Sequence, residues 1–165
     1  MNLKELLQKV TDKDLDTYIN DYFPNKLVRS DTLKESFGLT DREIEELYHQ
    51  GYLYYQQDLY DKCRQYFEFC VILDPFITKY WMALGATQQL VKDLDKALHS
   101  YAIAAYLDPD DPFAHFHAYE CLEALNNKCD AQKALKLAYK NANKVCYAHL
   151  KSKIERMIAN KATTL

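Results

Sequence analysis

Gly and Pro recur in this chain at one fixed spacing. Gly51 and Gly85 are 34 residues apart, and Pro75 and Pro109 have the same separation. The 165 residues include only three Gly and four Pro, so these two pairs are most of its strong turn formers. So few turn formers exclude a β-sandwich, a β-barrel or a Gly/Pro-rich linker. Abundant Leu, Ala, Lys and Glu instead predict an all-α fold.

The repeat extends further when residues 44–77 are aligned with residues 78–111. Small residues match at Cys63 and Ala97, and aromatic residues match at Phe67 and Tyr101. A 34-residue period with this pattern is the signature of the tetratricopeptide repeat, which has two antiparallel helices per unit. We expect the small residues to let the two helices approach closely and the aromatic residues to fill the space between hairpins. Six positions are identical: Gly51/Gly85, Asp61/Asp95, Lys62/Lys96, Leu73/Leu107, Asp74/Asp108 and Pro75/Pro109.

Each Asp-Pro pair is expected to end the second helix of its unit, because Pro disfavours helix at the residue before it. A third unit over residues 112–145 continues the frame with Ala131, Leu135 and Ala138. It departs from the pattern at Tyr119, where the first two units have Gly, and at Asn143, where they have Pro. We therefore predict a solenoid of three helix hairpins, 44–77, 78–111 and 112–145, with less regular packing in the third.

Residues outside the repeats also have helical patterns. Residues 146–165 are expected to form a capping helix with an apolar face. The residues of that face are Val145, Leu150, Ile154 and Met157 or Ile158. Residues 1–40 are expected to be an N-terminal helical segment with two short helices, one from Thr11 or Asp12 to Tyr22 and one from Ser30 or Asp31 to Phe37. Thr40 and Glu43 form a capping box that opens the first repeat helix. An apolar face at Leu15, Tyr18, Ile19 and Tyr22 would pack on the stack or on another copy of the chain.

The first helix of each unit is expected to line the concave side of the solenoid. Tyr48, Tyr52 and Tyr55 are spaced four and three residues apart, so they form one stripe along a helix. The stripe lies opposite the packing residues Leu47 and Gly51, which favours a groove over the alternative that these rings are core. Tyrosine suits a wet peptide-binding groove because it combines apolar area with a hydroxyl. The predicted groove residues are Tyr48, Tyr52, Tyr55, Lys79, Met82, Ala86, Gln89, Phe113, Phe116 and Glu120.

The groove positions also indicate what kind of peptide would fit. Repeats that clamp a C-terminal carboxylate need Lys and Asn where this chain has Tyr48 and Tyr52, and then Met82 and Ala86. An apolar groove with few cations favours an extended apolar peptide over an acidic tail. Ala86, the small residue in the middle, predicts a pocket between Tyr52 and Phe116.

Composition excludes several other classes of function. The formal net charge of −3 and the pI near 5.9 do not fit a nucleic-acid-binding protein, whose affinity depends on neutralising phosphates. The five Cys are odd in number and lack a CxxC pair, and His117 with Cys121 would supply only half of a zinc site. No nucleophile–base set or phosphate loop is present, and Glu120 and Glu123 are interpreted as a solvated rim. We therefore predict no metal, no cofactor and no enzyme activity.

The polar N-terminus and the short apolar stretches determine the expected location. Met1 to Glu5 do not lead into an apolar signal core, and the longest fully apolar stretch, 69–73, is far too short for a membrane span. We therefore expect a cytoplasmic protein without direct membrane insertion.

The sequence resembles the class II chaperones of bacterial type III secretion, which hold hydrophobic translocator proteins. The likeness covers about residues 35–140, and it is specific because it includes an off-consensus segment of the third unit. Family members have a small residue where this chain has Tyr119. The segments that carry the resemblance are Leu47-Tyr48, Gly51-Tyr52, Ala83-Leu84-Gly85-Ala86 with Gln89, His99-Ser100-Tyr101 and Phe116-His117-Ala118-Tyr119-Glu120-Cys121-Leu122.

The resemblance implies a bacterial cytoplasmic chaperone that binds an extended apolar segment of each translocator in its concave groove. By this resemblance Tyr48, Tyr52 and Tyr55 would form pockets for apolar side chains, continued by Met82, Ala86 and Phe116. It also implies a homodimer formed through the N-terminal helices, and a transcription regulator as a second candidate partner. The alternative is a generic tetratricopeptide-repeat adaptor that joins cytosolic proteins through its convex or edge surfaces.

Overall fold

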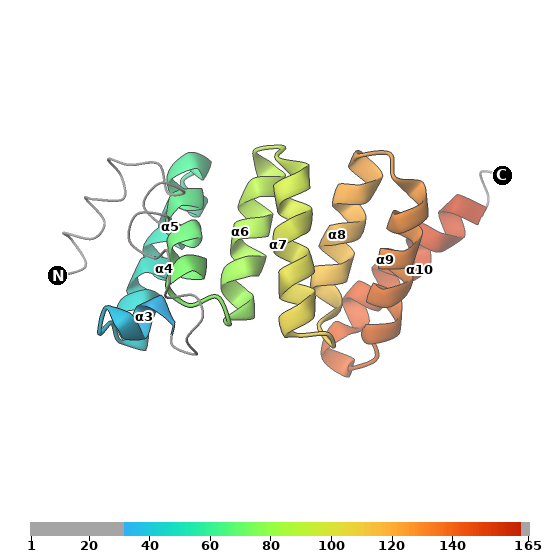
Figure 1. Cartoon of the computed structure of the whole chain (residues 1–165). Coiled ribbons are helices and arrows are strands. Elements are labelled where there is room, and N and C mark those ends of the chain that lie inside the picture. Colours follow the sequence, from blue (N-terminus) through green and yellow to red (C-terminus); the bar gives the residue numbers. More distant parts are fainter. Residues whose placement is uncertain (1–31, 163–165) are drawn as a thin grey trace.

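The computed structural model describes residues 32–162 as a row of helix hairpins (Figure 1). The first helices of the three hairpins are α4 (Asp41–Gln56), α6 (Thr78–Leu90) and α8 (Pro112–Ala124), and the second helices are α5 (Tyr60–Leu73), α7 (Leu94–Leu107) and α9 (Lys128–Asn141). No strand is present in the described range, so the prediction of an all-α repeat fold is confirmed. The other elements are α3 (Leu33–Ser36), the 3-10 turn η1 (Val145–Tyr147) and α10 (Ala148–Ala162).

Capping boxes fix where α3 and α4 begin. The Glu43 carboxylate accepts a hydrogen bond from the Thr40 backbone N–H at 2.8 Å, and the Thr40 hydroxyl accepts one from the Glu43 N–H, so this predicted box is confirmed. α3 begins later than predicted, at Leu33, because Thr32 and Glu35 form a second capping box there. The chain leaves α3 through Gly38, whose φ of +66° favours glycine. The predicted helix from Thr11 to Tyr22 and its apolar face lie outside the described residues.

The ends of the second helices follow the Asp-Pro pairs. α5 ends at Leu73 and α7 at Leu107, and in each case Asp and then Pro follow. At the opposite ends of the hairpins, the turns place one residue each in the left-handed region. These residues are Asp58, Lys92 and Asn126, with φ of 59°, 67° and 59°, and they too are 34 residues apart. Thus the tight turns of the repeat are made without glycine.

Gly51 and Gly85 allow close contact between the helices of their hairpins. A β-carbon on either residue would lie 2.8 Å from a ring carbon, of Phe67 in the first hairpin and of Tyr101 in the second. The small residues of the second helices, Cys63 on α5 and Ala97 on α7, are fully buried, as the repeat predicts. The helices therefore approach as expected, with the aromatic ring packed against the glycine of its own hairpin.

The third hairpin exchanges the large and small positions. Tyr119 stands at the glycine position and is buried, while Leu135 replaces the aromatic residue of α5 and α7 at the matching position of α9. Both side chains belong to one core cluster, together with Ala131 and Ala138. The larger residue on α8 is therefore matched by a smaller one on α9, which keeps the hairpin packed.

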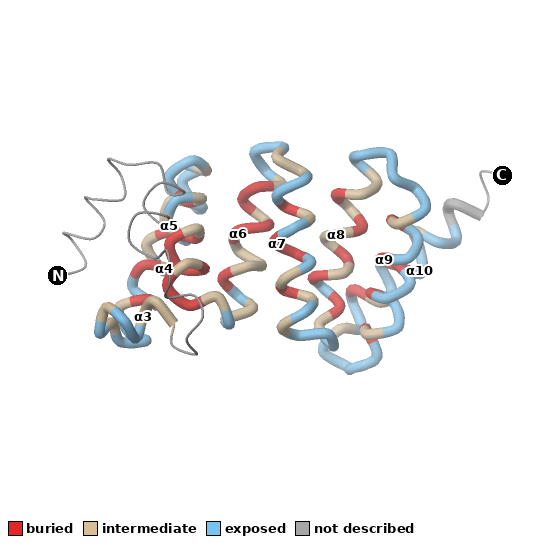
Figure 2. The backbone as a smooth tube through the Cα atoms, viewed as in Figure 1, coloured by how far each residue is buried: buried red, intermediate tan, exposed pale blue. Residues whose placement is uncertain are grey.

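α10 covers the last hairpin. Leu150 and Ile154 are buried against α8 and α9, and Met157 packs beside them. Val145 is 93% exposed because it lies in η1, before α10 begins, and Ile158 is also exposed. The prediction that these two residues belong to the buried apolar face is therefore wrong. Figure 2 shows the buried positions on the facing sides of neighbouring helices. No helix within residues 32–162 has the length and apolar content to span a bilayer.

Candidate functional site

The predicted tyrosine stripe lies on α4. Tyr52 and Tyr55 are exposed, and their rings stack with centroids 6.2 Å apart and planes within 10°. Tyr48 is half-buried, because its ring packs against Phe67 at 5.3 Å and Tyr80 at 5.5 Å. The stripe therefore starts at the core and becomes open surface towards the C-terminal end of α4.

A cavity of about 200 Å³ opens beside this stripe, and we call it the tyrosine pocket. Its floor includes Phe67 of α5, and its far wall is formed by Ala83 and Ala86 of α6. Short Ala side chains on α6 leave the space that the rings of α4 enclose. The volume is well above the ~30 Å³ that a water molecule occupies in the liquid, so apolar side chains of a peptide have room. The lining residues are Tyr48, Tyr52, Tyr55, Phe67, Ala83 and Ala86.

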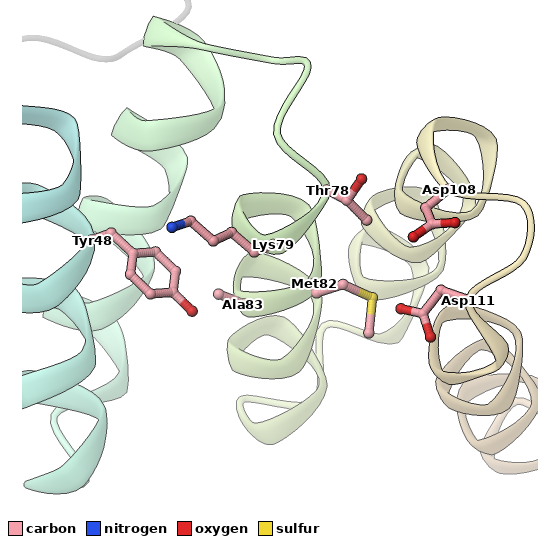
Figure 3. A pocket seen from close by; sticks show the side chains of 7 residues that line it. All are labelled: Tyr48, Thr78, Lys79, Met82, Ala83, Asp108 and Asp111. Atoms are coloured by element: carbon pink, nitrogen blue, oxygen red, sulfur yellow. The ribbon is translucent and has the colours of Figure 1, made fainter. Parts of the chain in front are cut away.

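A second cavity of about 440 Å³ lies next to it, and we call it the acidic pocket (Figure 3). It shares Tyr48 and Ala83 with the tyrosine pocket, so one extended segment could enter both. Asp108 and Asp111 lie at one side of this cavity, and Lys79 extends towards Tyr48 at the other. The lining residues are Tyr48, Thr78, Lys79, Met82, Ala83, Asp108 and Asp111.

Lys79 is held by the first hairpin. Its Nζ lies 2.5 Å from the Glu45 carboxylate, which also accepts a hydrogen bond from the Tyr80 hydroxyl at 2.9 Å. The hydrogen bond from Lys79 lowers the pKa of Glu45, although partial burial opposes this. The ammonium also lies 5.1 Å from the centre of the Tyr48 ring, within range of a cation–π interaction. Lys79 thus joins α6 to α4 beside both pockets.

The predicted groove residues farther along the solenoid do not line either pocket. Gln89 accepts a hydrogen bond from the Tyr101 hydroxyl at 2.9 Å, and Phe113 packs edge-on against Tyr147 while remaining exposed. The Glu120 carboxylate lies 3.0 Å from His117 Nδ1 and 3.5 Å from Lys153 Nζ. These side chains are on the expected helices, but their polar groups already have partners within the chain.

Phe116 departs from the prediction, because only 2% of its surface is exposed. Its ring packs against Tyr119, with centroids 5.9 Å apart, and the Lys153 ammonium of α10 lies 4.4 Å from its centre. The capping helix therefore covers the face of α8 that was expected to continue the groove. The predicted pocket beside Ala86 exists, but its other walls are Tyr52, Tyr55 and Phe67, not Phe116.

Several lining residues were not among the predicted ones. Phe67 was expected to fill the space between hairpins, yet it also borders the tyrosine pocket. Ala83 had no predicted role, although it lines both cavities. Asp108 was recognised only as the residue before Pro109, and Asp111 is the N-cap of α8, where its carboxylate accepts the Phe113 N–H at 2.9 Å. The short side chain of Ala86 beside the tyrosine stripe was the signal from which a cavity was expected.

The thiols and imidazoles of the described residues do not form a reactive cluster. Cys63, Cys70 and Cys121 are buried, and burial raises the pKa of Cys70 to about 12 and that of Cys121 to about 11. A raised pKa keeps each thiol protonated, which makes it a poor nucleophile or metal ligand. Within the part of the chain that the structure describes, no group of three His, Cys, Asp or Glu residues could hold a metal ion.

Comparison with known proteins identifies the family. The tetratricopeptide repeat model matches residues 78–111. The low calcium response locus protein H of Yersinia pestis is 30% identical over 116 residues, which are 70% of this chain and 69% of that protein. The chain belongs to the class II chaperones of type III secretion.

Solved structures of similar chains support the same assignment. A chain of the CopN–Scc3 complex is 32% identical, with a TM-score of 0.81 over 94% of this chain and 97% of that one. The type III secretion chaperone SycD of Yersinia enterocolitica, solved with a peptide of the translocator YopD, is 30% identical with a TM-score of 0.71. That match covers 76% of this chain and 98% of SycD. The fold of this class II chaperone is therefore that of chaperones whose complexes with client peptides are known.

Proposed function

We propose that this chain is a cytoplasmic chaperone that binds an extended apolar segment of type III secretion translocator proteins. The segment would lie across α4 and α6, with an apolar side chain in the tyrosine pocket. The exposed, stacked rings of Tyr52 and Tyr55 beside an open cavity are the observation that carries this proposal. Family membership and the SycD complex with a translocator peptide support the choice of client.

The mechanism is binding without turnover. A translocator has apolar segments suited to entering a membrane, and these would aggregate if they were exposed in the cytoplasm. Covering one such segment keeps the client soluble and competent for export. Ordering an extended peptide costs conformational entropy, so we expect moderate affinity unless other client surfaces are also bound.

Substitution of Tyr52 tests the proposed groove. Tyr52→Glu places a charge against the tyrosine pocket, and we expect co-expression with the cognate translocator to yield no soluble complex. Circular dichroism should show an unchanged helix content, because Tyr52 is exposed. The matched control is Tyr106→Glu, at a position on α7 that is 83% exposed and lines neither pocket.

The two substitutions also separate this function from that of a generic adaptor. A generic adaptor that used its convex or edge surfaces would be indifferent to Tyr52→Glu. A client that stays soluble with the Tyr52→Glu protein would therefore exclude the groove as its binding site. Loss of the complex with Tyr106→Glu alone would favour the adaptor.

We also propose that the chain forms a homodimer and that a transcription regulator is a second partner. Both proposals rest on the resemblance to the family. Light scattering of the full chain, alone and with its client, would give the mass of each species. A monomer at all protein concentrations would contradict the dimer, and failure to capture any regulator from the native host would contradict the second partner.

A further inference from the structure

Charge is distributed very unevenly along this chain. Residues 128–162, which include α9, η1 and α10, contain nine of the 21 Lys and Arg residues but only two of the 24 Asp and Glu residues. Their formal charge is therefore +7, whereas the rest of the chain has −10. α9 and α10 form the C-terminal end of the row of helices, away from the tyrosine pocket on α4 and α6 (Figure 1). One end of the solenoid is thus basic, although the whole chain is mildly acidic.

The lysines of this end lie along the exposed side of α9. Lys133, Lys136 and Lys140 are three and four residues apart, so they share one side of the helix, and all three are exposed. Leu137, which is 44% exposed, lies between them. The equivalent positions of the first two hairpins hold no cation, so the repeat itself does not require lysine there. The residues at those positions are Gln65, Glu68 and Ile72 in α5, and His99, Ala102 and Tyr106 in α7.

The basic side continues into the turn that follows α9. Lys144 and Val145 are both exposed there, and Val145 is almost fully so at 93%. Lys151 of α10 adds a cation beside this turn, since its Nζ lies 3.2 Å from Asn143 Oδ1 and Asn143 donates a hydrogen bond to the Lys140 carbonyl. We call the whole surface the basic face. Its residues are Lys133, Lys136, Leu137, Lys140, Lys144 and Val145.

Most charges of the basic face have no acidic partner within residues 32–162. Lys133 pairs with Asp130 at 2.7 Å, but Lys136, Lys140 and Lys144 take part in no ion pair with a residue of that range. Glu155, the other acid of this end, accepts a hydrogen bond from the Tyr139 hydroxyl at 3.2 Å. Like charges on one surface repel each other, so an anionic partner would stabilise this one.

We propose that the basic face binds the surface of a bilayer that contains anionic phospholipids. Lysines are attracted to such a surface by its negative potential. Leu137 and Val145 would enter the headgroup region, where exposed apolar side chains of peripheral proteins are buried. The contact is peripheral, since no helix within residues 32–162 is suited to span the bilayer. This inference goes beyond the proposed function and uses a different part of the molecule.

Two features favour a lipid surface over an acidic protein or a nucleic acid. The first is that every cation of the basic face is lysine. Arginine is the residue enriched at protein interfaces and suited to bidentate contacts with carboxylates and phosphates, whereas diffuse attraction to a charged surface needs no fixed geometry. The second is that Leu137 and Val145 are exposed among the lysines, because a phosphate backbone offers no apolar region to cover them.

Vesicle flotation of the full chain tests the proposal. One set of vesicles has equal parts of phosphatidylglycerol and phosphatidylcholine, and the other has phosphatidylcholine alone. We expect binding to the first set only. Binding should be lost at high salt, because the Debye length falls from about 10 Å at 0.1 M to about 3 Å at 1 M ionic strength.

Two matched triple variants locate the contact. Lys136→Gln/Lys140→Gln/Lys144→Gln removes the three unpaired charges and keeps a similar helix propensity, and we expect binding to the anionic vesicles to weaken at least about tenfold. The control Lys62→Gln/Lys92→Gln/Lys96→Gln removes the same charge from exposed positions of the first two hairpins. It should bind within about twofold of the unchanged chain, because these positions lie outside the basic face.

Val145→Asn tests the apolar part of the contact without a change in charge. We expect about threefold weaker binding to the anionic vesicles, since the side chain would no longer favour the headgroup region. Tighter binding to a short DNA duplex than to the vesicles, with no effect of Val145→Asn, would assign the face to nucleic acid and overturn the membrane contact.

The remaining outcomes separate this inference from the proposed function. Absence of binding to the anionic vesicles, equal binding to phosphatidylcholine alone, or equal losses in the two triple variants would each overturn the basic face as a membrane contact. The basic-face variant should still yield a soluble complex with the client, because the tyrosine pocket is on α4, α5 and α6. Failure of vesicle binding with an intact client complex would therefore leave the chaperone function in place.

Discussion

The ring of Tyr101 occupies the space that a side chain on Gly85 would need. A β-carbon on Gly85 would lie 2.8 Å from Tyr101 Cε1 and 2.9 Å from Cδ1. The ring is also stacked on His117, with centroids 5.3 Å apart, and its hydroxyl donates to Gln89. It therefore has contacts on several sides that oppose its displacement, and the second hairpin depends on the absence of a side chain at Gly85.

We expect Gly85→Ala to lower the free energy of unfolding by about 1–2 kcal/mol. Overpacking a core usually costs about 1–3 kcal/mol, and the gain in helix propensity returns at most about 1 kcal/mol. Urea denaturation measures the difference. The exposed position Ala102 on α7 supplies the control, because Ala102→Gly reports the propensity contribution alone. A Gly85→Ala protein as stable as the unchanged chain would contradict the close contact.

Lys34 connects α3 to the first hairpin. We expect Lys34→Met to destabilise the protein by about 1–3 kcal/mol, because the Asp74 carboxylate, with a side chain only 9% exposed, loses its cation. The hydrogen bonds to Asp41 and Asp74 also raise the pKa of Lys34 above its ordinary 10.5, so this contribution is fully present at neutral pH and is lost only as the pH rises above that value. Arg42→Met removes a comparable cation, whose side chain is 87% exposed, and should change stability by less than about 0.5 kcal/mol. Equal effects in thermal unfolding would rule out a special role for Lys34.

Ala86 sets the depth of the tyrosine pocket. We expect Ala86→Leu to fill the cavity and to weaken binding of an apolar client peptide at least about tenfold. The leucine side chain and the apolar side chain of the peptide would compete for the same volume. Stability should change little because the added atoms enter open space. Ala102→Leu makes the same chemical change on the exposed side of α7 and should leave the affinity unchanged. Undiminished binding by Ala86→Leu would place the peptide elsewhere.

Glu120 is expected to make the stability of the third hairpin depend on pH. Burial raises its pKa, but the hydrogen bond to His117, together with the charges of His117 and Lys153, lowers the net value below the ordinary 4.5. A carboxylate with a lowered folded-state pKa stabilises the protein above its unfolded pKa. That contribution is lost as the pH falls from about 4.5 through the folded-state value.

Glu120→Gln should therefore reduce the loss of stability on acidification. Urea midpoints of the variant and the unchanged chain are compared at neutral pH and below pH 4.5. The exposed Glu46 provides the control substitution, Glu46→Gln. An identical acid dependence for Glu120→Gln and the unchanged chain would show that the carboxylate does not contribute.

The repeat frame could be predicted because few residue types satisfy its steric demands. Gly85 opposite an aromatic ring and Pro109 after α7 each have one physical role, and the structure assigns them that role. The left-handed turn residues were not predictable in this way. Asp58, Lys92 and Asn126 share a backbone conformation but no residue type, so composition gave no signal for their common spacing.

The candidate site was less predictable because helix periodicity determines which face a residue occupies, but not what later covers that face. Tyr52 and Tyr55 remain exposed, whereas Phe116 on the equivalent face of α8 is covered by Lys153 of α10. Asp108 and Asp111 are only three residues apart in the loop between α7 and α8, but the acidic pocket also needs Tyr48 of α4 and Met82 of α6 beside them. Such a combination follows only from the three-dimensional arrangement.

Tyr119 and Leu135 belong to a separate core at the last hairpin. That core includes Ile154 of α10, whereas the tyrosine pocket lies over the core of α4, α5 and α6. Units of a solenoid interact with their neighbours only, so the end of the stack can open without its beginning. The rate of amide hydrogen exchange in α9 and α10 should therefore be independent of the rate in α4 and α6. Binding of a client segment should slow exchange in α4 and α6 and leave it unchanged in α9 and α10.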